Sequence, residues 1–204
     1  MSLTFYYTPM SSATRVHWAL EEVGAPYEKV KINLAEGEQK KPESLKLNPN
    51  GKVPLLVVDG RPLFESLAQL LYVGETYGVD EGLFPPPGID RAEAFKWMAW
   101  GSVTLSEVFM RILRNGERFP EEERNAKAKE AAMRDAGGLF RILDDHLASR
   151  AYVLGDAFSL VDVSIASYVP FAARLGIDTQ PFTHVQAWVA RCMARPALAR
   201  AMAG

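Results

Sequence analysis

The chain is poor in the residues that form disulfides and metal sites. Among its 204 residues it has one cysteine, Cys192, and three histidines. A single cysteine excludes an internal disulfide and fits a reducing compartment such as the cytoplasm. The histidines, His17, His146 and His184, are far apart and show none of the short spacings typical of metal ligands. The sequence therefore predicts no metal site.

Long apolar runs and an excess of one charge are also missing. No run approaches the roughly 20 apolar residues that span a bilayer, so we expect no membrane segment. The first residues show no basic stretch followed by an apolar one, and nothing in them indicates export. The formal net charge of −2 argues against a nucleic-acid surface, which needs clustered Lys and Arg. We therefore expect a cytoplasmic globular protein with no nucleic-acid or membrane partner.

The first 78 residues alternate strand and helix signals. Aromatic, β-branched or alternating runs predict strands at residues 3–8, 27–33 and 53–58 and, after an Asp-Gly turn, at 62–64. Apolar residues at helical spacing predict helices over 13–23 and 65–77. The lysine-rich stretch EGEQKKPESLKLNPNG is interpreted as loop with one short helix. This order, βαβαββα, predicts a thioredoxin-like α/β domain.

The pattern changes after residue 78. The stretch GVDEGLFPPPG has three consecutive prolines and no period, which is typical of a semi-rigid linker. Beyond it the period is entirely helical, with apolar stripes predicting helices over 91–114 and 121–149. We predict three parts, namely a thioredoxin-like domain at 1–78, a linker at 79–88 and an all-helical domain at 89–204.

The second domain contains one clear helix start, in the motif SLVD. Ser159 is placed to cap the helix, and the carboxylate of Asp162, three residues on, is able to reach back to it. Pro170, eight residues further, is expected to end or kink that helix. We therefore expect a short helix held by a capping box.

Two adjacent serines follow the first strand in PMSSATR. A serine before a helix accepts a hydrogen bond from a free backbone N–H, which explains one hydroxyl but not both. A helix N-terminus also stabilises an anion, and a hydroxyl that donates to a thiolate adds to this effect. Since no cysteine lies near this end of the chain, the thiol would have to come from a ligand. Ser11 and Ser12 are both candidates.

Other residues of the first domain suggest the rest of that ligand. In NPNGKVPLL, Val53 precedes Pro54, and an X-Pro bond that is cis can turn backbone groups outward to pair with an extended peptide. In LFESLAQ, Glu65 and Ser66 form an acidic first helical turn. They are also able to bind the ammonium and the carboxylate of an amino-acid headgroup.

Three lysines, Lys40, Lys41 and Lys52, lie in the stretch before the third strand. Such a charge run is commonly solvated surface, but it would also meet a second carboxylate. A zwitterionic headgroup, a thiol, a backbone-like middle and a terminal carboxylate together describe glutathione.

Along nearly its whole length the chain resembles the cytosolic glutathione transferases, in particular bacterial-like members of the serine type. The resemblance rests on the order and spacing of four motifs: YYTPMSSATRV, KKPESLKLNPNGKVPLLVVDG, LFESLAQLLYV and FSLVDVSIA. It implies a glutathione-binding thioredoxin-like domain, a helical second domain, a cis-proline at Pro54 and a detoxifying enzyme that is usually a homodimer. Asn50 departs from classes in which an aromatic residue at this place plugs the partner subunit.

The resemblance also implies which hydroxyl acts. In serine-type members the catalytic hydroxyl usually lies four residues before an arginine, and Ser11 has this spacing to Arg15. Ser12 stands where thiol-type relatives have cysteine, so it is the alternative or the helix cap. Tyr7 resembles the tyrosine that other classes use and is a further alternative.

The family further implies a site for the electrophile, lined partly by the first helix of the second domain. The candidates for it are Met10, Trp97, Trp100, Thr104 and Val108. The expected reaction is attack of the glutathione thiolate, held by Ser11, on a small hydrophobic electrophile. Glutathione serves as co-substrate, and no metal is required. The alternatives are a glutathione-dependent peroxidase and a non-catalytic binding module with the same fold.

Overall fold

The chain divides into two compact units in its structure, a computed structural model that describes residues 2–117 and 119–203. The first unit extends through Pro86 and takes in the chain again from Arg195 onward. The second unit is Pro87–Ala194. Within the described residues, no helix is long and apolar enough to cross a membrane.

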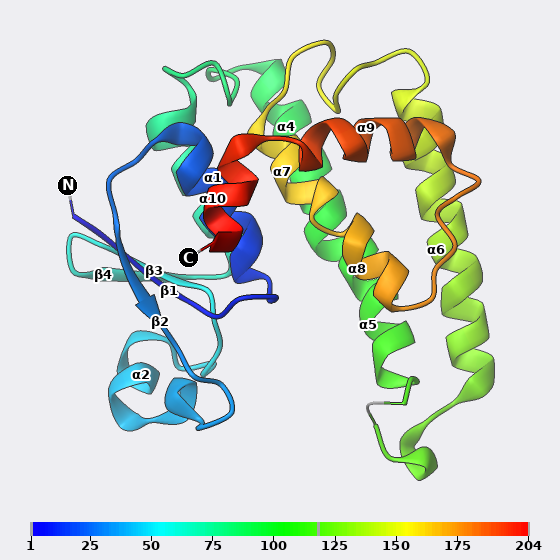
Figure 1. The fold of residues 1–204 in the computed structure, drawn as a ribbon, viewed down its shortest axis with the longest axis horizontal. Helices are drawn as coiled ribbons and strands as arrows, with labels where there is room; N and C mark the ends of the chain where they lie inside the picture. The colour runs from blue at the N-terminus through cyan, green and yellow to red at the C-terminus, as the bar shows by residue number, and fades with distance from the viewer. Residues whose placement is uncertain (1, 118, 204) are drawn as a thin grey trace. The chain divides into compact units, whose positions relative to one another are not determined.

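The first unit is a four-stranded sheet with helices (Figure 1). Its elements are β1 (Leu3–Tyr7), α1 (Ala13–Val23), β2 (Glu28–Lys31), a 3-10 turn (Glu38–Lys40), α2 (Pro42–Leu47), β3 (Leu55–Val58), β4 (Arg61–Phe64), α3 (Ser66–Val73), a π-helical turn (Gly74–Gly78) and α10 (Pro196–Ala203). The strand order is β2-β1-β3-β4, with β1 parallel to β2 and antiparallel to β3. This confirms the predicted thioredoxin-like fold.

The core of this unit follows from the alternation of β1. Leu3, Phe5 and Tyr7 are buried, whereas the residues between them are only half-buried, so one face of the strand is covered. In the sheet Phe5 lies opposite Leu56 of β3, and neither side chain is exposed at all. The first strand therefore brings an apolar surface under α1 and ends at the turn that leads into that helix.

Several predicted boundaries differ from the observed ones. The strand predicted over 27–33 is confined to β2, and the lysine-rich loop holds a 3-10 turn as well as α2. The helix predicted over 65–77 is α-helical only from Ser66 to Val73 and continues as a π-helical turn. A π turn holds one extra residue but keeps the chain helical, so apolar spacing does not reveal it.

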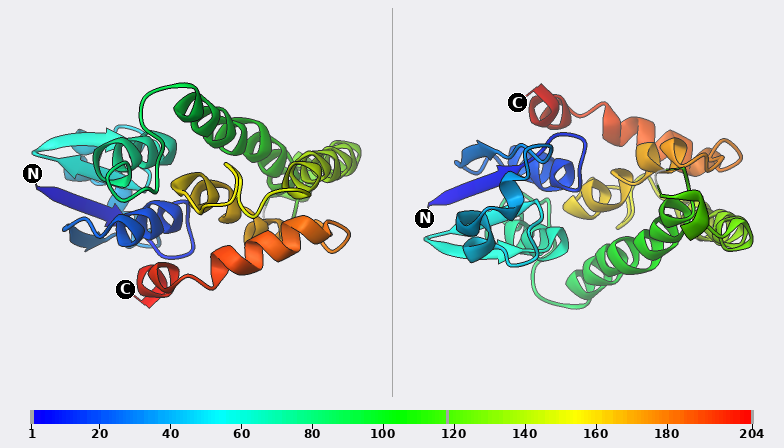
Figure 2. Two further views of the ribbon diagram at one scale, coloured as in Figure 1. Left: turned by 90° about the horizontal axis from the view of Figure 1, so that it is seen from above. Right: turned by 90° about the horizontal axis from the view of Figure 1, so that it is seen from below.

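The helix α10 packs on α1, and the two lie side by side in Figures 1 and 2. Arg195 donates to both carboxylate oxygens of Glu22, at 2.6 and 2.7 Å. Arg200 donates to the Glu21 carboxylate at 2.8 Å. Residues 195–203, predicted as part of the helical domain, thus pack with the first unit, where these two arginines pair with neighbouring glutamates of α1.

The predicted linker also differs from the observed division. Phe84, inside the proline-containing stretch, is buried and packs against Gly74 so closely that a Cβ there would lie 2.8 Å from its ring. This contact ties residues up to Pro86 to the first unit. The glycine is therefore required for the close approach of the ring.

The second unit is helical, as predicted. Its elements are α4 (Ile89–Ala99), a π-helical turn (Trp100–Leu105), α5 (Ser106–Arg114), a 3-10 turn (Glu121–Glu123), α6 (Ala126–Leu147), α7 (Leu160–Ala166), α8 (Val169–Arg174) and α9 (Thr183–Met193). The single helix predicted over 91–114 is thus interrupted by a π turn. The helix predicted over 121–149 is α6, which begins later and is preceded by the 3-10 turn.

The start of α7 is held by several buried hydrogen bonds. Ser159 and Asp162 form the predicted capping box, with the Ser159 N–H donating to the Asp162 carboxylate at 2.8 Å. The same carboxylate accepts from the backbone N–H of Val153 and the indole N–H of Trp188. Burial raises the pKa of Asp162, although all these hydrogen bonds oppose the rise. Two residues outside any helix separate α7 from α8, and Pro170 lies in the first turn of α8.

Candidate functional site

The turn from β1 to α1 is strained at an exposed residue. Met10 has φ 60° and a 57% exposed side chain. A non-glycine residue in this region costs on the order of 1–3 kcal/mol, and such residues cluster at functional sites. Thr8, two residues earlier, donates its hydroxyl to the carbonyl of Ile32 and so fixes the end of β1. The turn therefore has a rigid base and an exposed tip.

Ser11 lies just after this tip with its hydroxyl half-buried. Its Oγ donates to the Thr8 carbonyl at 2.7 Å and accepts from the Ala13 N–H at 3.1 Å. The Thr14 N–H bonds the Ser11 carbonyl at 3.1 Å, which closes the first turn. The Ser11 hydroxyl therefore accepts a hydrogen bond from the start of α1, and it donates its own proton to one neutral acceptor, the Thr8 carbonyl.

Ser12 does not cap the helix with its side chain, contrary to the prediction that this neighbour would serve the helix. Its backbone is already helical, with φ −61° and ψ −12°, and its side chain makes no capping hydrogen bond. A capping side chain needs the extended backbone of a residue outside the helix. Ser12 is therefore an exposed residue whose side chain does not cap α1.

Tyr7 is placed in the core of the first unit. It is 5% exposed, and its ring stacks on Phe5 with centroids 5.6 Å apart. His17 of α1 packs on the same ring at 5.3 Å and is itself buried. Burial lowers the pKa of His17, helped by the nearby Lys29 cation, so this imidazole is neutral near pH 7. Tyr7 thus shares an aromatic cluster with a neutral histidine.

The second part of the candidate site is the loop before β3. The Val53–Pro54 peptide bond is cis, as the family resemblance implies. Asn48 is buried and donates to the Lys52 carbonyl at 2.8 Å, while its side-chain oxygen accepts from the Asn50 N–H. One asparagine therefore holds the loop that delivers Val53 to the strand.

Glu65 and Ser66 form the third part, at the start of α3. Glu65 has φ 71° and an exposed side chain, and Ser66 is the first residue of the helix. Like Met10, Glu65 is a non-glycine residue with positive φ. Two of the predicted site positions therefore carry backbone strain, which supports a functional role for both.

The three lysines are not equivalent. Lys40 extends over Gly51, where a Cβ would lie 2.7 Å from its Cδ, and its ammonium donates to the Asn50 carbonyl at 3.4 Å. Lys41 pairs with Glu38 at 3.8 Å, so its charge is partly compensated. Lys52 is exposed. Lys40 and Lys52 are therefore better placed than Lys41 to receive a carboxylate.

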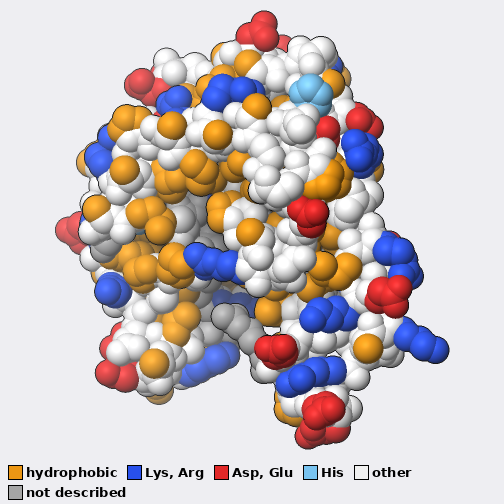
Figure 3. All heavy atoms as spheres, turned by 45° about the vertical axis from the view of Figure 1, so that its right-hand side comes forward, with side chains coloured by type: hydrophobic (Ala, Val, Ile, Leu, Met, Phe, Trp, Pro, Cys, Tyr) orange, Lys and Arg blue, Asp and Glu red, His pale blue; other side chains and the backbone are white. Residues whose placement is uncertain are grey.

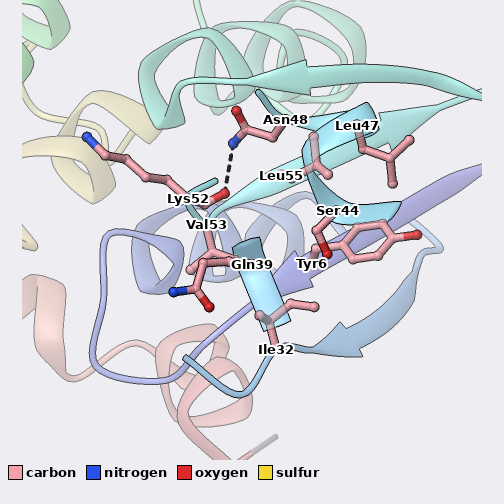
Figure 4. A pocket seen from close by; sticks show the side chains of 9 residues that line it. All are labelled: Tyr6, Ile32, Gln39, Ser44, Leu47, Asn48, Lys52, Val53 and Leu55. Carbon is pink, nitrogen blue, oxygen red and sulfur yellow. Dashed lines mark hydrogen bonds between the residues drawn. The ribbon is translucent and has the colours of Figure 1, made fainter. Parts of the chain in front are cut away.

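Lys52 and Val53 share a pocket with about 300 Å³ of empty space open to solvent (Figure 4). Tyr6 and Leu55 form its floor on the sheet, and Ser44 belongs to its α2 side. The Lys52 side chain extends away from the Tyr6 ring in this view. Two of the predicted glutathione-binding residues are thus brought together, and Gln39, which the sequence interpretation did not include, also lines the pocket.

A second residue that the sequence interpretation missed is Gln69. It is completely buried in α3, and its amide donates to the carbonyls of Pro54 and Leu63 at 3.1 and 2.7 Å. The signal was present in the sequence, because a glutamine stands on the apolar stripe that contains Leu70 and Val73. A polar side chain on such a stripe needs hydrogen-bond partners.

The candidates for the electrophile site differ in exposure. On the first unit, Met10 is the exposed apolar residue next to Ser11. On the second unit, Trp97 is buried with its ring 4.3 Å from that of His146, and Val108 is also buried. Trp100 is half-buried and Thr104 is exposed in the π-helical turn. Turns of this kind are frequent at functional sites.

Neither the charges on the face drawn in Figure 3 nor the metal-ligating residues that the structure describes indicate another kind of site. On the face drawn in Figure 3, acidic and basic side chains are interspersed. Among residues 2–117 and 119–203, no group of three His, Cys, Asp or Glu side chains is arranged to hold a metal ion. The lone cysteine, Cys192, is buried in α9.

Known proteins resemble the chain in sequence and in structure. The family model of the glutathione S-transferase N-terminal domain matches residues 1–75, and that of the C-terminal domain matches residues 103–196. Glutathione S-transferase GstB of Escherichia coli strain K12 is 34% identical over 190 residues, which cover 92% of this chain and 91% of that protein.

Two solved structures extend the similarity. A theta class glutathione S-transferase of Xanthomonas axonopodis pv. citri, with glutathione bound, superposes with a TM-score of 0.85, 31% identity and coverage of 100% of this chain and 98% of its own. A glutathione transferase of Burkholderia graminis, with two glutathione molecules bound per subunit, has a TM-score of 0.88, 29% identity and coverage of 98% and 87%. With both family models and a relative above 30% identity, the chain belongs to the glutathione S-transferase family.

Proposed function

We propose that this protein is a glutathione transferase in which Ser11 holds the glutathione sulfur as a thiolate at the start of α1. The observation that carries the proposal is the hydrogen bonding of the Ser11 hydroxyl. Its Oγ accepts from the Ala13 N–H of the helix, and its proton is donated to a backbone carbonyl, that of Thr8. This proton can be redirected without breaking the first turn of α1.

Redirecting the proton is favourable when an anion arrives. A hydrogen bond to a thiolate is charge-assisted and roughly twice as strong as a neutral one to a carbonyl. The bond from Ala13 to Oγ remains and withdraws electron density from the hydroxyl. Ser11 therefore exchanges one acceptor for a better one while it still binds the helix.

The energy required is modest. A free thiol has a pKa of about 8.5, and lowering it by two units takes roughly 2.7 kcal/mol, at about 1.36 kcal/mol per unit. A charge-assisted hydrogen bond contributes about 1.5–3 kcal/mol, and the helix N-terminus adds about 0.3–1 kcal/mol. Together these two effects give about 1.8–4 kcal/mol, a range that includes the required energy without a second basic group.

The other predicted residues position the tripeptide in this proposal. The backbone at Val53 pairs with its middle, as an added strand would. Glu65 receives the ammonium and Ser66 the carboxylate of the γ-glutamyl end. Lys40 and Lys52 meet the glycine carboxylate, with Lys41 a weaker partner because of its pairing with Glu38.

The reaction follows from the bound thiolate. The thiol proton passes to water when glutathione binds, and the sulfur electron pair forms a bond to an electrophilic carbon. In a substitution the leaving group departs with the electrons of its bond, and in an addition the resulting carbanion takes a proton from water. Availability of the thiolate and its orientation supply the rate. Met10 offers an apolar contact beside Ser11 for a hydrophobic electrophile.

The test compares Ser11→Ala with the matched control Ser12→Ala. With an aryl halide at saturating glutathione, Ser11→Ala is expected to lower turnover about 30-fold, the equivalent of about 2 kcal/mol for a charge-assisted hydrogen bond. Glutathione affinity should change less than threefold, because Val53, Glu65 and the lysines remain. Ser12→Ala should keep both values.

A second measurement examines the thiolate itself. Ultraviolet absorbance of the bound thiolate, followed against pH, should give a lower pKa for glutathione on the wild-type protein than in buffer. In Ser11→Ala this difference should shrink. An unchanged thiol pKa on the wild-type protein would contradict the proposed mechanism, and failure of the wild type to turn over any electrophile would favour a binding module.

Peroxide reduction is the second candidate. The observation that favours it is the relative from Burkholderia graminis, whose structure holds two glutathione molecules per subunit. Reduction of a hydroperoxide consumes two: the first thiolate attacks the O–O bond, releasing an alcohol and leaving a sulfenic acid, and the second thiol displaces water to give the disulfide. Assays of one sample with an aryl halide and with a hydroperoxide separate the two activities.

We further propose that the enzyme is a cytoplasmic homodimer. The buried lone cysteine fits a reducing compartment, and exposed apolar side chains such as Phe64 and Ile89 are available for subunit contacts. Sedimentation equilibrium of the purified protein tests the assembly, and a single species of monomer mass would contradict it.

A further inference from the structure

Gln69 joins two parts of the proposed glutathione site through one side chain. It is completely buried in α3. Its Nε2 donates to the Pro54 carbonyl at 3.1 Å and to the Leu63 carbonyl at 2.7 Å. Its backbone N–H donates to the Glu65 carbonyl at 3.1 Å. Gln69 is therefore bonded to Pro54, the residue after Val53, to β4, which leads into Glu65, and to Glu65 itself.

These bonds lie where the pairing of β3 with β4 ends. The last paired residues are Leu55 and Phe64, so Pro54 and Glu65 are the first residues beyond the ladder. Beyond this pair, the segments at Pro54 and Glu65 are not joined by the hydrogen bonds of the β3–β4 ladder. Here the amide of Gln69 links the Pro54 carbonyl to the carbonyl of Leu63, two residues before Glu65.

Packing alone does not account for a glutamine at this place. A leucine or methionine would fill the volume, and the Oε1 of Gln69 has no hydrogen-bond partner among the described residues. Leaving a buried acceptor unpaired costs stability. What the side chain supplies is two N–H donors, and the two carbonyl acceptors fix which way the amide faces.

We propose that Gln69 is a positioning residue that fixes the spacing between the backbone at Val53 and the Glu65–Ser66 pair, and so sets the preference for thiols carrying a γ-glutamyl end. This inference rests on the proposed function, because Val53, Glu65 and Ser66 are the proposed contacts of the tripeptide. Gln69 itself is buried and touches no ligand. It acts only through the backbone carbonyls that it holds.

The test uses the full chain and two thiols, glutathione and cysteinylglycine, which lacks the γ-glutamyl group. Binding of each is measured by calorimetry for the wild type, for Gln69→Met, which keeps the volume but removes both donors, and for the control Leu71→Met on the same helix. In Gln69→Met the wild-type preference for glutathione over cysteinylglycine should fall about tenfold. Turnover at saturating glutathione should change less than threefold, because Ser11 is not bonded to Gln69.

A purely structural role would weaken both thiols equally, so the ratio of the two affinities separates the two explanations. A ratio within twofold of the wild-type value in Gln69→Met overturns the inference. Should that variant fail to fold, the same ratio of affinities is measured for Gln69→Glu, which keeps the shape of the side chain but lacks the two amide donors. If the wild type itself shows no preference for glutathione, the proposed function fails first.

Discussion

The helices α7 and α1 each follow a serine that contacts their first turn, and the two serines make opposite kinds of hydrogen bond. At the start of α7, Ser159 is buried, and both its N–H and its hydroxyl donate to the Asp162 carboxylate. At the start of α1, the Ser11 hydroxyl is half-buried, donates to a backbone carbonyl and accepts one N–H. The first serine donates to a carboxylate, and the second is held by backbone groups alone.

In the proposed mechanism, this difference separates a structural serine from a reactive one. A buried hydroxyl that already donates to a carboxylate gains nothing from a second anion. A half-buried hydroxyl that donates to a carbonyl gains from exchanging it for an anion. In this proposal, what distinguishes the start of α1 is the hydrogen bond from Ser11 to the Thr8 carbonyl, which an anion can replace, and not the presence of a serine.

The largest effect on stability is expected at the carboxylate of the α7 start. Asp162→Ala removes the acceptor of three buried N–H groups, those of Val153, Ser159 and Trp188. Since each unpaired buried donor costs about 1–3 kcal/mol, a loss of about 4 kcal/mol is expected. Urea unfolding measures it, with Asp156→Ala, an exposed carboxylate of the same loop, as control. A loss similar to that of the control would remove the contrast between the two starts.

A smaller effect is expected for the serine of the same box. Ser159→Ala should lower the free energy of unfolding by about 1 kcal/mol, the usual value of a lost helix cap. Turnover per folded molecule should be unchanged. Ser159→Thr keeps a hydroxyl and should recover part of the loss, whereas equal losses in both variants would indicate a packing effect.

The serine of α1 should show the reverse balance. Ser11→Ala is expected to lower the free energy of unfolding by only about 0.5 kcal/mol, at the low end of cap values, because water can reach the site of the half-buried hydroxyl. The loss of turnover is the larger effect. Thermal unfolding and turnover are measured on one sample. A stability loss above that of Ser159→Ala with normal turnover would make Ser11 a cap and nothing more.

The smallest effect belongs to the neighbouring serine. Ser12 is exposed and makes no capping hydrogen bond. Ser12→Ala should therefore stay within about 0.5 kcal/mol of the wild-type stability, as surface substitutions do, with turnover unchanged. A tenfold loss of turnover would transfer the sulfur-binding role from Ser11 to Ser12.

Local patterns predicted the architecture but not its irregular turns. Strand alternation and helical spacing placed α1 correctly, because each depends only on near neighbours in the chain. The π turns at Gly74–Gly78 and Trp100–Leu105 escaped, since one extra residue in a turn leaves the apolar spacing nearly intact. The division of roles between the serines required the backbone angles of Ser12, which no spacing supplies.

Long-range contacts were also beyond the reach of the sequence. The pairing of Arg195 with Glu22 joins residues 173 positions apart, and that of Arg200 with Glu21 joins residues 179 apart. A periodic pattern has no information at this distance, so residues 195–203 were expected in the helical domain rather than beside α1. Gln69 was visible as a polar residue on an apolar stripe, but only the structure identifies its two acceptors.

The packing of α10 on α1 has a consequence for biosynthesis. On the ribosome, every strand of the first unit emerges before residues 87–194, yet the helix that covers α1 emerges after them. More than a hundred residues are therefore translated between the last strand of the sheet and α10. During that time Glu21 and Glu22 lack the arginines that pair with them in the folded protein. Completion of the first unit thus depends on synthesis of α10, so a chain that stops before residue 195 lacks the helix that covers α1.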